Sequence, residues 1–362
     1  MYRPIYFLYF LVFLVIGWEG YSFCSTFNQV YETTLEGSVT RNLALSQVIN
    51  AVAASQTVEK EVKVMFVGDV MISRAVGDKI EKAKNPNYPF ILVASTTQSM
   101  DILFANLETP ISTRGKNQGS IYSFRADPKV VNGLVFAGFD VVSLANNHIW
   151  DWGKDALSDT VEILQKNNIA TVGAGKNLEE AEKPAVIKKK GTTFAFLGYT
   201  NLLPKSMEAE TSTPGLSRFD PEKIKSAIEV VRKNADIVVV SLHWGEEYET
   251  QANNFQKTLG RDLVKAGADF VIGHHPHVIQ EMEEYTATST VIVATSTTGA
   301  TSTIKESHGW IVYSLGNFVF DQDAPGTREG LGLVVAVKNG KISEVVKQKI
   351  VISKDYQPSF AN

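Results

Sequence analysis

Acidic, amide and imidazole side chains follow five apolar runs of this sequence, each at the point where the run ends. These positions hold Asp69, Asn106 and Glu108, Asn146 to His148, His243, and His274, His275 and His277. Five of the six histidines in the chain are among them. If the runs are parallel strands, their carboxyl ends meet at one edge of a sheet, where α/β proteins bind ligands. The pattern therefore predicts one polar site built from five strand ends.

The chemistry of this set is that of a metal site with oxygen and imidazole ligands. Proline stiffens the turn His275-Pro276-His277, so both imidazoles can face one side of a loop. Imidazole is the commonest metal ligand near neutral pH. A set without thiolates suits Mn, Fe or Zn, and it does not suit a structural zinc finger or a calcium loop. Six ligands with a bridging carboxylate are what a two-metal hydrolase needs, so we expect one or two divalent ions per chain.

Each strand end also has an ordinary explanation when it is considered alone. Asp69 after a strand is typical of a turn or a cap, and Asn146-Asn147 is typical of a turn. A lone histidine such as His243 is more often structural than a ligand. The coincidence of all five strand ends is what favours the metal site.

The elements that position these residues alternate along the chain. Short β-branched runs begin near residues 63, 101, 140, 193, 236, 269, 310 and 331. Helical patterns cover residues 128–137, 154–167, 221–234 and 254–266. Two of these begin with Asp-Pro, at Asp127 and Asp220, which is an N-cap followed by proline at the first helical position. The alternation predicts an α/β domain with a largely buried sheet.

The composition excludes some classes of function. The chain has 362 residues, of which 44% are hydrophobic, and its net charge is −4. No basic stripe runs along it, so we expect no nucleic acid partner. The single cysteine, Cys24, excludes an intrachain disulfide and a cysteine-based zinc site.

The N-terminal residues differ from the rest of the chain. An uncharged apolar run from Ile5 to Trp18 follows Arg3, and its fourteen residues suit a signal-peptide core better than a spanning helix of roughly 20. Beyond Glu19 the chain stays uncharged for twelve residues, so a longer, tilted anchor is the alternative. We expect residues 1–24 to be a signal peptide or membrane anchor, and the protein to be extracytoplasmic, either membrane-anchored or secreted.

The remainder of the chain divides by composition. Residues 25–61 are rich in polar residues and are interpreted as a stalk or linker, residues 62–352 as the folded domain, and residues 353–362 as a tail. Within the domain, residues 285–308 consist mostly of Ser, Thr, Ala and Val. We interpret them as an inserted loop or an extended hairpin. They are either a polar surface loop or a flap that faces a substrate or partner.

The order of the polar motifs resembles that of the calcineurin-like metallophosphoesterase superfamily. These motifs are Gly68-Asp69, Asn106-Leu107-Glu108, Asn147-His148, His243 and His275-Pro276-His277. The local sequence is similar to the branch of CapA-type capsule and poly-γ-glutamate biosynthesis proteins. The segments that carry this similarity are GDVM at 68–71, ANLETPI at 105–111, FRADP at 124–128, GFDVVSLANNHIWDWG at 138–153, HWGEEY at 243–248, GHHPHVIQ at 273–280 and YSLGNFVFDQ at 313–322. The resemblance covers about residues 62–350.

The resemblance implies a fold and a set of roles. The fold is α/β, a four-layer α/β/β/α sandwich of two mixed sheets. The implied metal ligands are Asp69, Glu108, Asn147, His243, His275 and His277. Glu108 would bridge two ions, and His148 would act as the catalytic residue beside them. The superfamily pattern has a histidine where this chain has Met71, which predicts that one of the two metal positions is weak.

Four further residues are candidate substrate contacts. They are Arg74, Arg125, His274 and Asn317. The alternative for either arginine is a role at the surface or in capping a sheet. His274 is additional to the two imidazole ligands beside it, so it could contact either a ligand or the substrate.

Three functions are compatible with the sequence. The leading hypothesis is an extracytoplasmic, metal-dependent role in making, anchoring or exporting an anionic surface polymer such as capsule or poly-γ-glutamate. The second is a stand-alone phosphoesterase or hydrolase acting on a phosphorylated or polymeric envelope substrate. The third is a non-catalytic assembly subunit of a membrane polymer synthase. The membrane, the polymer and synthase subunits are the expected partners.

Fractionation of cells that produce the tagged protein tests the expected export. The apolar run behind Arg3 should direct the chain to the membrane, so we expect it in the membrane fraction or outside the cell. Recovery of the intact chain from the cytosol would contradict this expectation.

Overall fold

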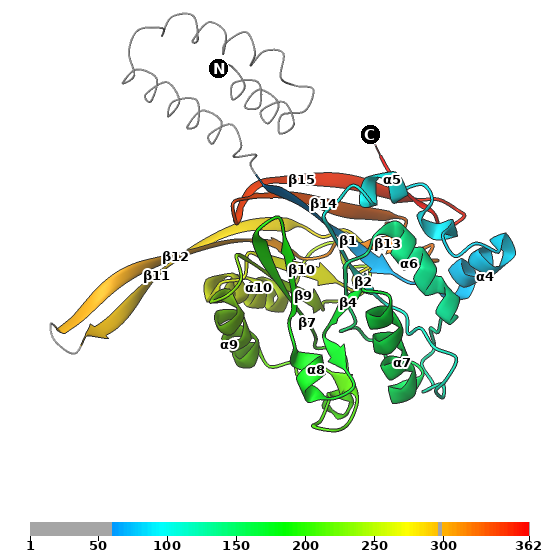
Figure 1. The fold of residues 1–362 in the computed structure, drawn as a ribbon, viewed down its shortest axis with the longest axis horizontal. Coiled ribbons are helices and arrows are strands. Elements are labelled where there is room, and N and C mark those ends of the chain that lie inside the picture. Colours follow the sequence, from blue (N-terminus) through cyan, green and yellow to red (C-terminus); the bar gives the residue numbers. More distant parts are fainter. Residues whose placement is uncertain (1–59, 296–298, 362) are drawn as a thin grey trace, which may run out of the picture. The chain divides into compact units, whose positions relative to one another are not determined.

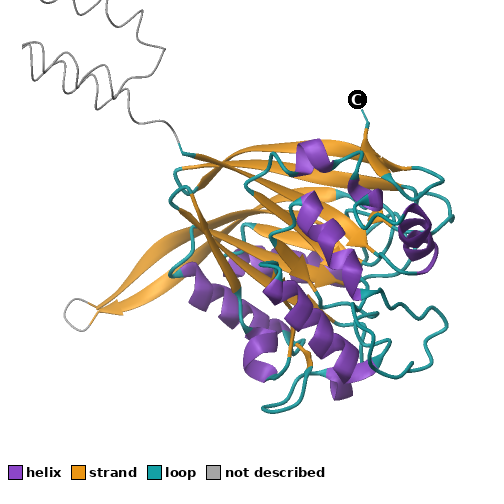
Figure 2. Cartoon of the chain, turned by 45° about the vertical axis from the view of Figure 1, so that its right-hand side comes forward, coloured by secondary structure: helices purple, strands orange, loops and turns teal. Residues whose placement is uncertain are grey.

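The computed structural model describes residues 60–295 and 299–361. This part of the chain contains two large β-sheets with helices on their outer faces (Figures 1 and 2). No helix within these ranges is both long and apolar enough to cross a bilayer. The predicted signal peptide or anchor, residues 1–24, and almost all of the predicted stalk lie outside the described residues.

The first sheet is mixed and has eight strands. Its order is β16-β15-β14-β1-β2-β3-β4, and β13 also pairs with β1. The strands β1 to β4 run parallel to one another, whereas β14, β15 and β16 continue the sheet with antiparallel pairings. The strands are β1 (Glu61–Val70), β2 (Ile102–Leu107), β3 (Val141–Ser143), β4 (Ala170–Val172), β13 (Asn317–Val319), β14 (Glu329–Lys338), β15 (Lys341–Ile352) and β16 (Pro358–Phe360).

The second sheet is also mixed, with the order β11-β12-β10-β9-β7-β6. Its central strands β7, β9, β10 and β12 are parallel, and the edge strands β6 and β11 are antiparallel to their neighbours. The strands are β6 (Ala185–Lys189), β7 (Thr192–Thr200), β9 (Ile237–His243), β10 (Phe270–His274), β11 (Met282–Thr295) and β12 (Gly299–Val312). A small third sheet pairs β5 (Ala174–Gly175) with β8 (Gly215–Leu216).

Helices connect the strands and cover the sheets. They are α4 (Arg74–Ala83), α5 (Ala94–Thr97), α6 (Val131–Ala137), α7 (Gly153–Lys166), α8 (Leu178–Glu182), α9 (Pro221–Arg232) and α10 (Asn254–Ala266), with 3-10 turns η2 (Tyr88–Phe90), η3 (Pro128–Val130) and η4 (Lys205–Met207). Both predicted Asp-Pro starts are present: Asp127 accepts a hydrogen bond from Lys129 N, and Asp220 accepts one from Glu222 N. These caps satisfy backbone N–H groups that a helix start would otherwise leave without a partner.

Alternate residues of each strand face two different cores. In β9, Val239 faces the other sheet, while Val238 and Val240 pack in the core that contains Ile224 of α9 and Leu263 of α10. The first sheet behaves in the same way, with α4, α6 and α7 over its outer face. Because every central strand is buried on both faces, each appears in the sequence as a continuous apolar run. The observed order of layers is helix, sheet, sheet, helix, which is the predicted four-layer sandwich.

Aromatic rings join the two sheets beneath the strand ends. Phe66 of the first sheet lies 5.4 Å from Phe270 of the second, measured between ring centroids. Phe104 stacks on Phe196 at 5.6 Å and also contacts the ring of His274 at 6.2 Å. These contacts set the separation of the sheets directly below the predicted site.

The described residues of the predicted insertion, 285–295 and 299–308, form the two strands of an extended hairpin. Its strands β11 and β12 have 14 residues each and pair antiparallel from Met282 opposite Val312 to Thr295 opposite Gly299. The hairpin leaves the body of the domain as a two-stranded arm (Figure 1). At the C-terminus, β16 pairs with the free edge of β15, so the sheet continues beyond residue 352 into the predicted tail.

Gly68 allows β1 to approach the segment before β13, and its substitution should be costly. A Cβ atom at Gly68 would lie 1.9 Å from the carbonyl oxygen of Gly316, which accepts the hydrogen bond of Asp69 N. We expect Gly68→Ala to lower the free energy of unfolding by about 1–3 kcal/mol. Gly77→Ala in α4 is the control, because the nearest atom to its added Cβ is at 3.6 Å and alanine favours a helix by up to about 1 kcal/mol. Equal unfolding midpoints of the two variants in urea would contradict this prediction.

Candidate metal centre

The strand registers within each sheet align five polar residues of the site. Asp69 pairs with Asn106 of β2 and with Asn317 of β13, while His243 pairs with His274 across β9 and β10. All five residues are buried. Four of them stand at or near the carboxyl ends of their parallel strands, whereas Asn317 is the first residue of β13. The first sheet thus supplies mainly carboxylates and amides, and the second supplies imidazoles.

Asn106 holds the two buried carboxylates together. Its Nδ2 donates to Asp69 Oδ1 at 2.8 Å and to Glu108 Oε2 at 3.2 Å. The backbone N–H of His275 donates to Asp69 Oδ2 at 3.3 Å. Asn146 in turn donates to Asn106 Oδ1 at 3.0 Å, which fixes the amide that bridges the carboxylates. The sequence pattern pointed to the strand end at Asn106 but not to this bridging role.

The histidines reach the same cluster of carboxylates and amides. His277 Nε2 lies 3.7 Å from Glu108 Oε1, and His243 Nε2 lies 2.8 Å from Asn147 Oδ1. The Nδ1 atom of His277 is 3.0 Å from the Oδ1 atom of Asn317, which can only accept. Nδ1 therefore carries the proton, and Nε2 keeps the lone pair that a metal ligand needs. The predicted substrate contact Asn317 thus orients His277.

Two groups of ligand atoms are close enough to hold cations. The first comprises Asp69, Glu108 and His243, all buried, and the second comprises His275 and His277 with the exposed Glu247. Within each group, the ligand atoms lie within 4.8 Å of one another. The structure therefore brings together all six sequence-predicted ligands, with Asn147 joined through His243. Glu247 was not predicted, although it lies in the HWGEEY segment.

The two buried carboxyl groups have opposite pKa shifts. Burial and the negative charges of Asp69 and Glu247 raise the pKa of Glu108 well above its ordinary value. Burial alone would raise the pKa of Asp69 as well, but interactions with His274 and His277 hold it well below its usual range. Without a cation, this pair thus keeps one negative charge on Asp69 and favours a proton on Glu108.

The imidazoles are poised in the neutral form that binds metals. Burial and the neighbouring His275 lower the pKa of His243 well below its usual range. Burial and His277 lower the pKa of His275 to about 3. Metal ligands must be deprotonated, so at neutral pH these two rings need not release a proton before they bind an ion.

Several polar atoms of the site lack a hydrogen-bond partner among the residues that the structure describes. They are Glu108 Oε1, His275 Nδ1 and both ring nitrogens of His274, although His274 Nδ1 lies 3.2 Å from Asp69 Oδ1. An unsatisfied buried polar group costs about 1–3 kcal/mol. Unpartnered carboxylate and imidazole atoms within one buried cluster are what a divalent cation would satisfy. The residues present therefore fit the expected metal.

His148 stands at the edge of this cluster with a partner of its own. Its Nδ1 lies 2.8 Å from Asp151 Oδ2, and its ring stacks on Phe124 at 4.0 Å between centroids. Because the Asp151 carboxylate accepts, Nδ1 carries the proton and Nε2 faces Glu108 Oε1 at 3.8 Å. Asp151 was missed in the sequence because it does not follow a strand, although its spacing of three residues from His148 is a local signal.

The two candidate arginines are held by other side chains. Arg74 makes a salt bridge with Asp321 at 3.1 Å and lies 5.3 Å above the ring of Phe124. Arg125 lies 3.4 Å above the ring of Trp152. Arg74 is thus linked to His148 through Phe124, whereas the contacts of Arg125 are with the helix-start residue Trp152 and the Arg114 carbonyl.

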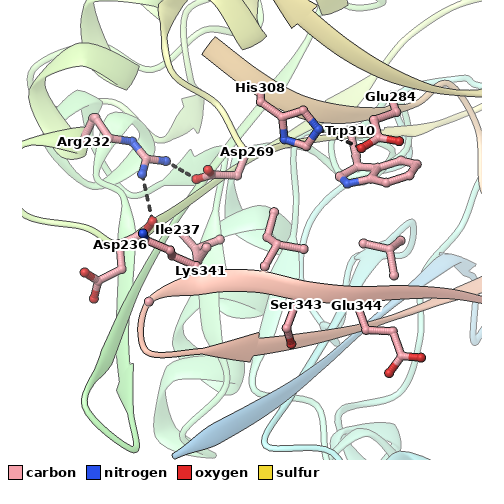
Figure 3. A pocket seen from close by; sticks show the side chains of 13 residues that line it. Arg232, Asp236, Ile237, Asp269, Glu284, His308, Trp310, Lys341, Ser343 and Glu344 are labelled. Carbon is pink, nitrogen blue, oxygen red and sulfur yellow. Dashed lines mark hydrogen bonds and ion pairs between the residues drawn. The ribbon is translucent and has the colours of Figure 1, made fainter. Parts of the chain in front are cut away.

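A cleft of about 530 Å³ lies away from these residues (Figure 3). It is lined by residues that include Asp236 and Asp269, which precede β9 and β10, so it lies at the amino ends of the strands. Its guanidinium, Arg232, is already bonded to Asp269 and to the carbonyl of Asp236. Ligands of α/β sheets bind at the carboxyl ends, so the metal-ligand cluster is the better candidate site.

A family model and two curated proteins that are similar to this chain are all described as capsule or PGA synthesis proteins. The family model described as bacterial capsule synthesis protein PGA_cap matches residues 63–322. The "PGA biosynthesis protein CapA" of Bacillus subtilis (strain 168) is 36% identical over 267 residues, which are 73% of this chain and 64% of that protein. The "Capsule biosynthesis protein CapA" of Bacillus anthracis is 32% identical over 272 residues, 73% of this chain and 61% of that protein. The chain thus spans less than two thirds of the length of these relatives.

Among solved structures, the calcineurin-like phosphoesterase YfkN from Bacillus subtilis matches with a TM-score of 0.39 and 12% sequence identity. The match covers 80% of this chain and 90% of that chain.

The raised pKa of Glu108 predicts how the stability of the metal-free protein depends on pH. The folded protein retains a proton that the unfolded chain releases near the ordinary value of 4.5, so the contribution of Glu108 to stability falls as pH rises above that value. The neutral variant Glu108→Gln lacks this titration. With a chelator present, we expect the stability of the wild type relative to Glu108→Gln to fall with rising pH, by at most about 1.4 kcal/mol per pH unit.

Urea denaturation of both proteins at a series of pH values measures this difference. The free energy of unfolding of the variant is subtracted from that of the wild type at each pH. This removes the contributions of His243 and His275, whose lowered pKa values make stability rise with pH below about 6.5. A difference that does not change with pH would show that Glu108 is not held in a protonated state.

Proposed function

The chain belongs to the family of bacterial capsule synthesis proteins, PGA_cap, and on that premise we propose that it acts outside the cytoplasm in the synthesis, anchoring or export of a capsular or poly-γ-glutamate-type polymer. The names of the relatives from Bacillus subtilis and Bacillus anthracis support this class of substrate. The apolar N-terminal run supports a location at or beyond the membrane. Membrane synthase subunits are the partners that such a role requires.

We propose further that the site is a metal-dependent hydrolytic site of phosphoesterase type. The observation that carries this proposal is that six ligand-type residues lie together where strands of the two sheets end, five of them buried and Asn147 partly buried, with unpartnered ligand atoms among them. The ligands would be Asp69, Glu108, Asn147, His243, His275 and His277. Divalent ions of Mn, Fe or Zn bound there would supply Lewis-acid polarisation of a phosphoryl or acyl oxygen.

The residues around the ligands have separable tasks. Asp151 fixes the tautomer of His148, so Nε2 of that ring can accept a proton from the substrate or return one to a leaving group. Phe124 covers one face of the His148 ring and limits its access to water. Asn317 performs the same orienting task for His277, whose Nε2 is thereby kept for a metal.

Paired histidine variants test whether binding and chemistry are separate. We expect His275→Ala to lose bound metal, because it removes a ligand from the buried cluster. We expect His148→Ala to keep metal and fold but to lose about 10²–10⁴ in rate, the usual contribution of a general acid or base. His308→Ala is the control, since that exposed histidine contacts Glu284 on the arm and should change neither property.

Three measurements on each variant are needed. They are metal content by elemental analysis, melting temperature, and either restoration of polymer in a deficient strain or hydrolysis of a model phosphodiester. If His148→Ala restores polymer fully, the site functions by binding alone, and the protein is a non-catalytic assembly subunit. If the purified protein hydrolyses phosphodiesters but is not required for polymer, it is a stand-alone hydrolase of the envelope.

A further inference from the structure

One ligand position of the centre lacks the imidazole that the superfamily pattern would supply. Met71 occupies that position, and it is fully buried. Its sulfur accepts hydrogen bonds from Ser73 N at 3.3 Å and Ser73 Oγ at 3.2 Å. A thioether is a poor ligand for Mn or Zn, and this sulfur already has two donors. Met71 therefore does not supply the nitrogen or oxygen ligand that Mn²⁺ or Zn²⁺ would need.

Glu247 brings a carboxylate to the same centre from another element. A carboxylate oxygen of Glu247 and ring nitrogens of His275 and His277 all lie within 4.8 Å of one another. Glu247 is exposed, whereas both imidazoles are buried. The group thus has a closed imidazole side and an open carboxylate side, which leaves room for a ligand from solvent or substrate.

The loop that carries Glu247 is fastened to the turn that carries the two imidazoles. Tyr248 N donates to the carbonyl oxygen of Pro276 at 2.8 Å. Gly245, two residues before Glu247, has φ of +87°, and an added Cβ would lie 2.8 Å from Gln256 Nε2. Glycine is therefore required for the bend that brings the loop from the end of β9 to Pro276.

The imidazole side of the group has an independent feature that points to a ligand. His275 is only 7% exposed, and its Nδ1 has no hydrogen-bond partner among the described residues. His275 and His277 both have left-handed backbones, with φ of +98° and +59°. Such conformations cost about 1–3 kcal/mol each and are concentrated at functional sites. The turn is thus held in a costly shape that presents two imidazoles to one point.

We propose that Glu247 is a metal ligand, which with His275 and His277 completes a three-ligand position at a centre to which Met71 contributes none. This inference rests on the proposed metal-dependent function of the site. Two imidazoles and one carboxylate form the ligand set of catalytic zinc sites and of iron(II) sites with open positions. A carboxylate is a harder ligand than an imidazole, so Glu247 should raise the affinity for Mn²⁺ relative to Zn²⁺, compared with an imidazole at the same position.

The test compares variants at two adjacent glutamates in the full-length protein. Glu247→Gln removes the ligand charge, and Glu246→Gln is the matched control on the same exposed loop. Binding of Mn²⁺ and of Zn²⁺ is measured separately, by equilibrium dialysis with elemental analysis. We expect Glu247→Gln to weaken Mn²⁺ binding at one position by more than about tenfold, because even outer partners of metal ligands contribute 10–100-fold. Glu246→Gln should bind both ions as the wild type does.

A third variant, Glu247→His, separates loss of a ligand from loss of charge. It should restore Zn²⁺ binding relative to Glu247→Gln while Mn²⁺ binding stays weak, because imidazole suits zinc. Equal Mn²⁺ affinities of Glu247→Gln and Glu246→Gln would overturn the assignment of Glu247 and leave the proposed function intact. If the wild type binds neither ion, the proposed metal-dependent function fails together with this inference. Melting temperatures confirm that each exposed variant is folded.

Discussion

The burial of two carboxylates in one site is the constraint on which the rest of this centre depends. Asp69 and Glu108 are both fully buried, and a single amide, that of Asn106, donates to both. Two like charges in a medium of low dielectric repel each other strongly, so one must be neutralised by a proton or both by a cation. The opposite pKa shifts of the pair correspond to a proton on Glu108 and a negative charge on Asp69. The surrounding imidazoles would provide the further ligands that a cation needs.

The four-layer sandwich allows this constraint to be met because neither sheet could build the centre alone. Carboxylates and amides end β1 and β2, whereas the imidazoles end β9 and β10. The distance between them is set by the core between the sheets, where Phe66 packs on Phe270 and Phe104 packs on both Phe196 and His274. A change in that aromatic core would therefore alter the ligand geometry without touching a ligand. Packing and site chemistry are coupled through the separation of the two sheets.

The sequence allowed prediction of those features that arise from local pattern. Central strands that are buried on both faces appear as apolar runs, so the layers could be predicted. Parallel strands end at one edge of a sheet, which gave the location of the site, and Asp-Pro marked two helix starts. Glu247 and Asp151 could not, because neither directly ends an apolar run and their relevance comes from loops that fold back onto other elements. The strand β15 was missed because most of its side chains are exposed or half-buried, and its place is set by pairing with β14.

The single atom Glu108 Oε1 links the electrostatics of the centre to its chemistry. It is buried without a hydrogen-bond partner among the described residues, and both His277 Nε2 and His148 Nε2 approach it, at 3.7 Å and 3.8 Å. In both rings an acceptor at Nδ1 leaves the Nε2 lone pair directed at this oxygen. A proton on Glu108 and the proposed metal ion would therefore compete for one position. Because binding of an ion would displace that proton, the carboxyl group with the raised pKa is also the one whose ionisation would control loading of the proposed metal centre.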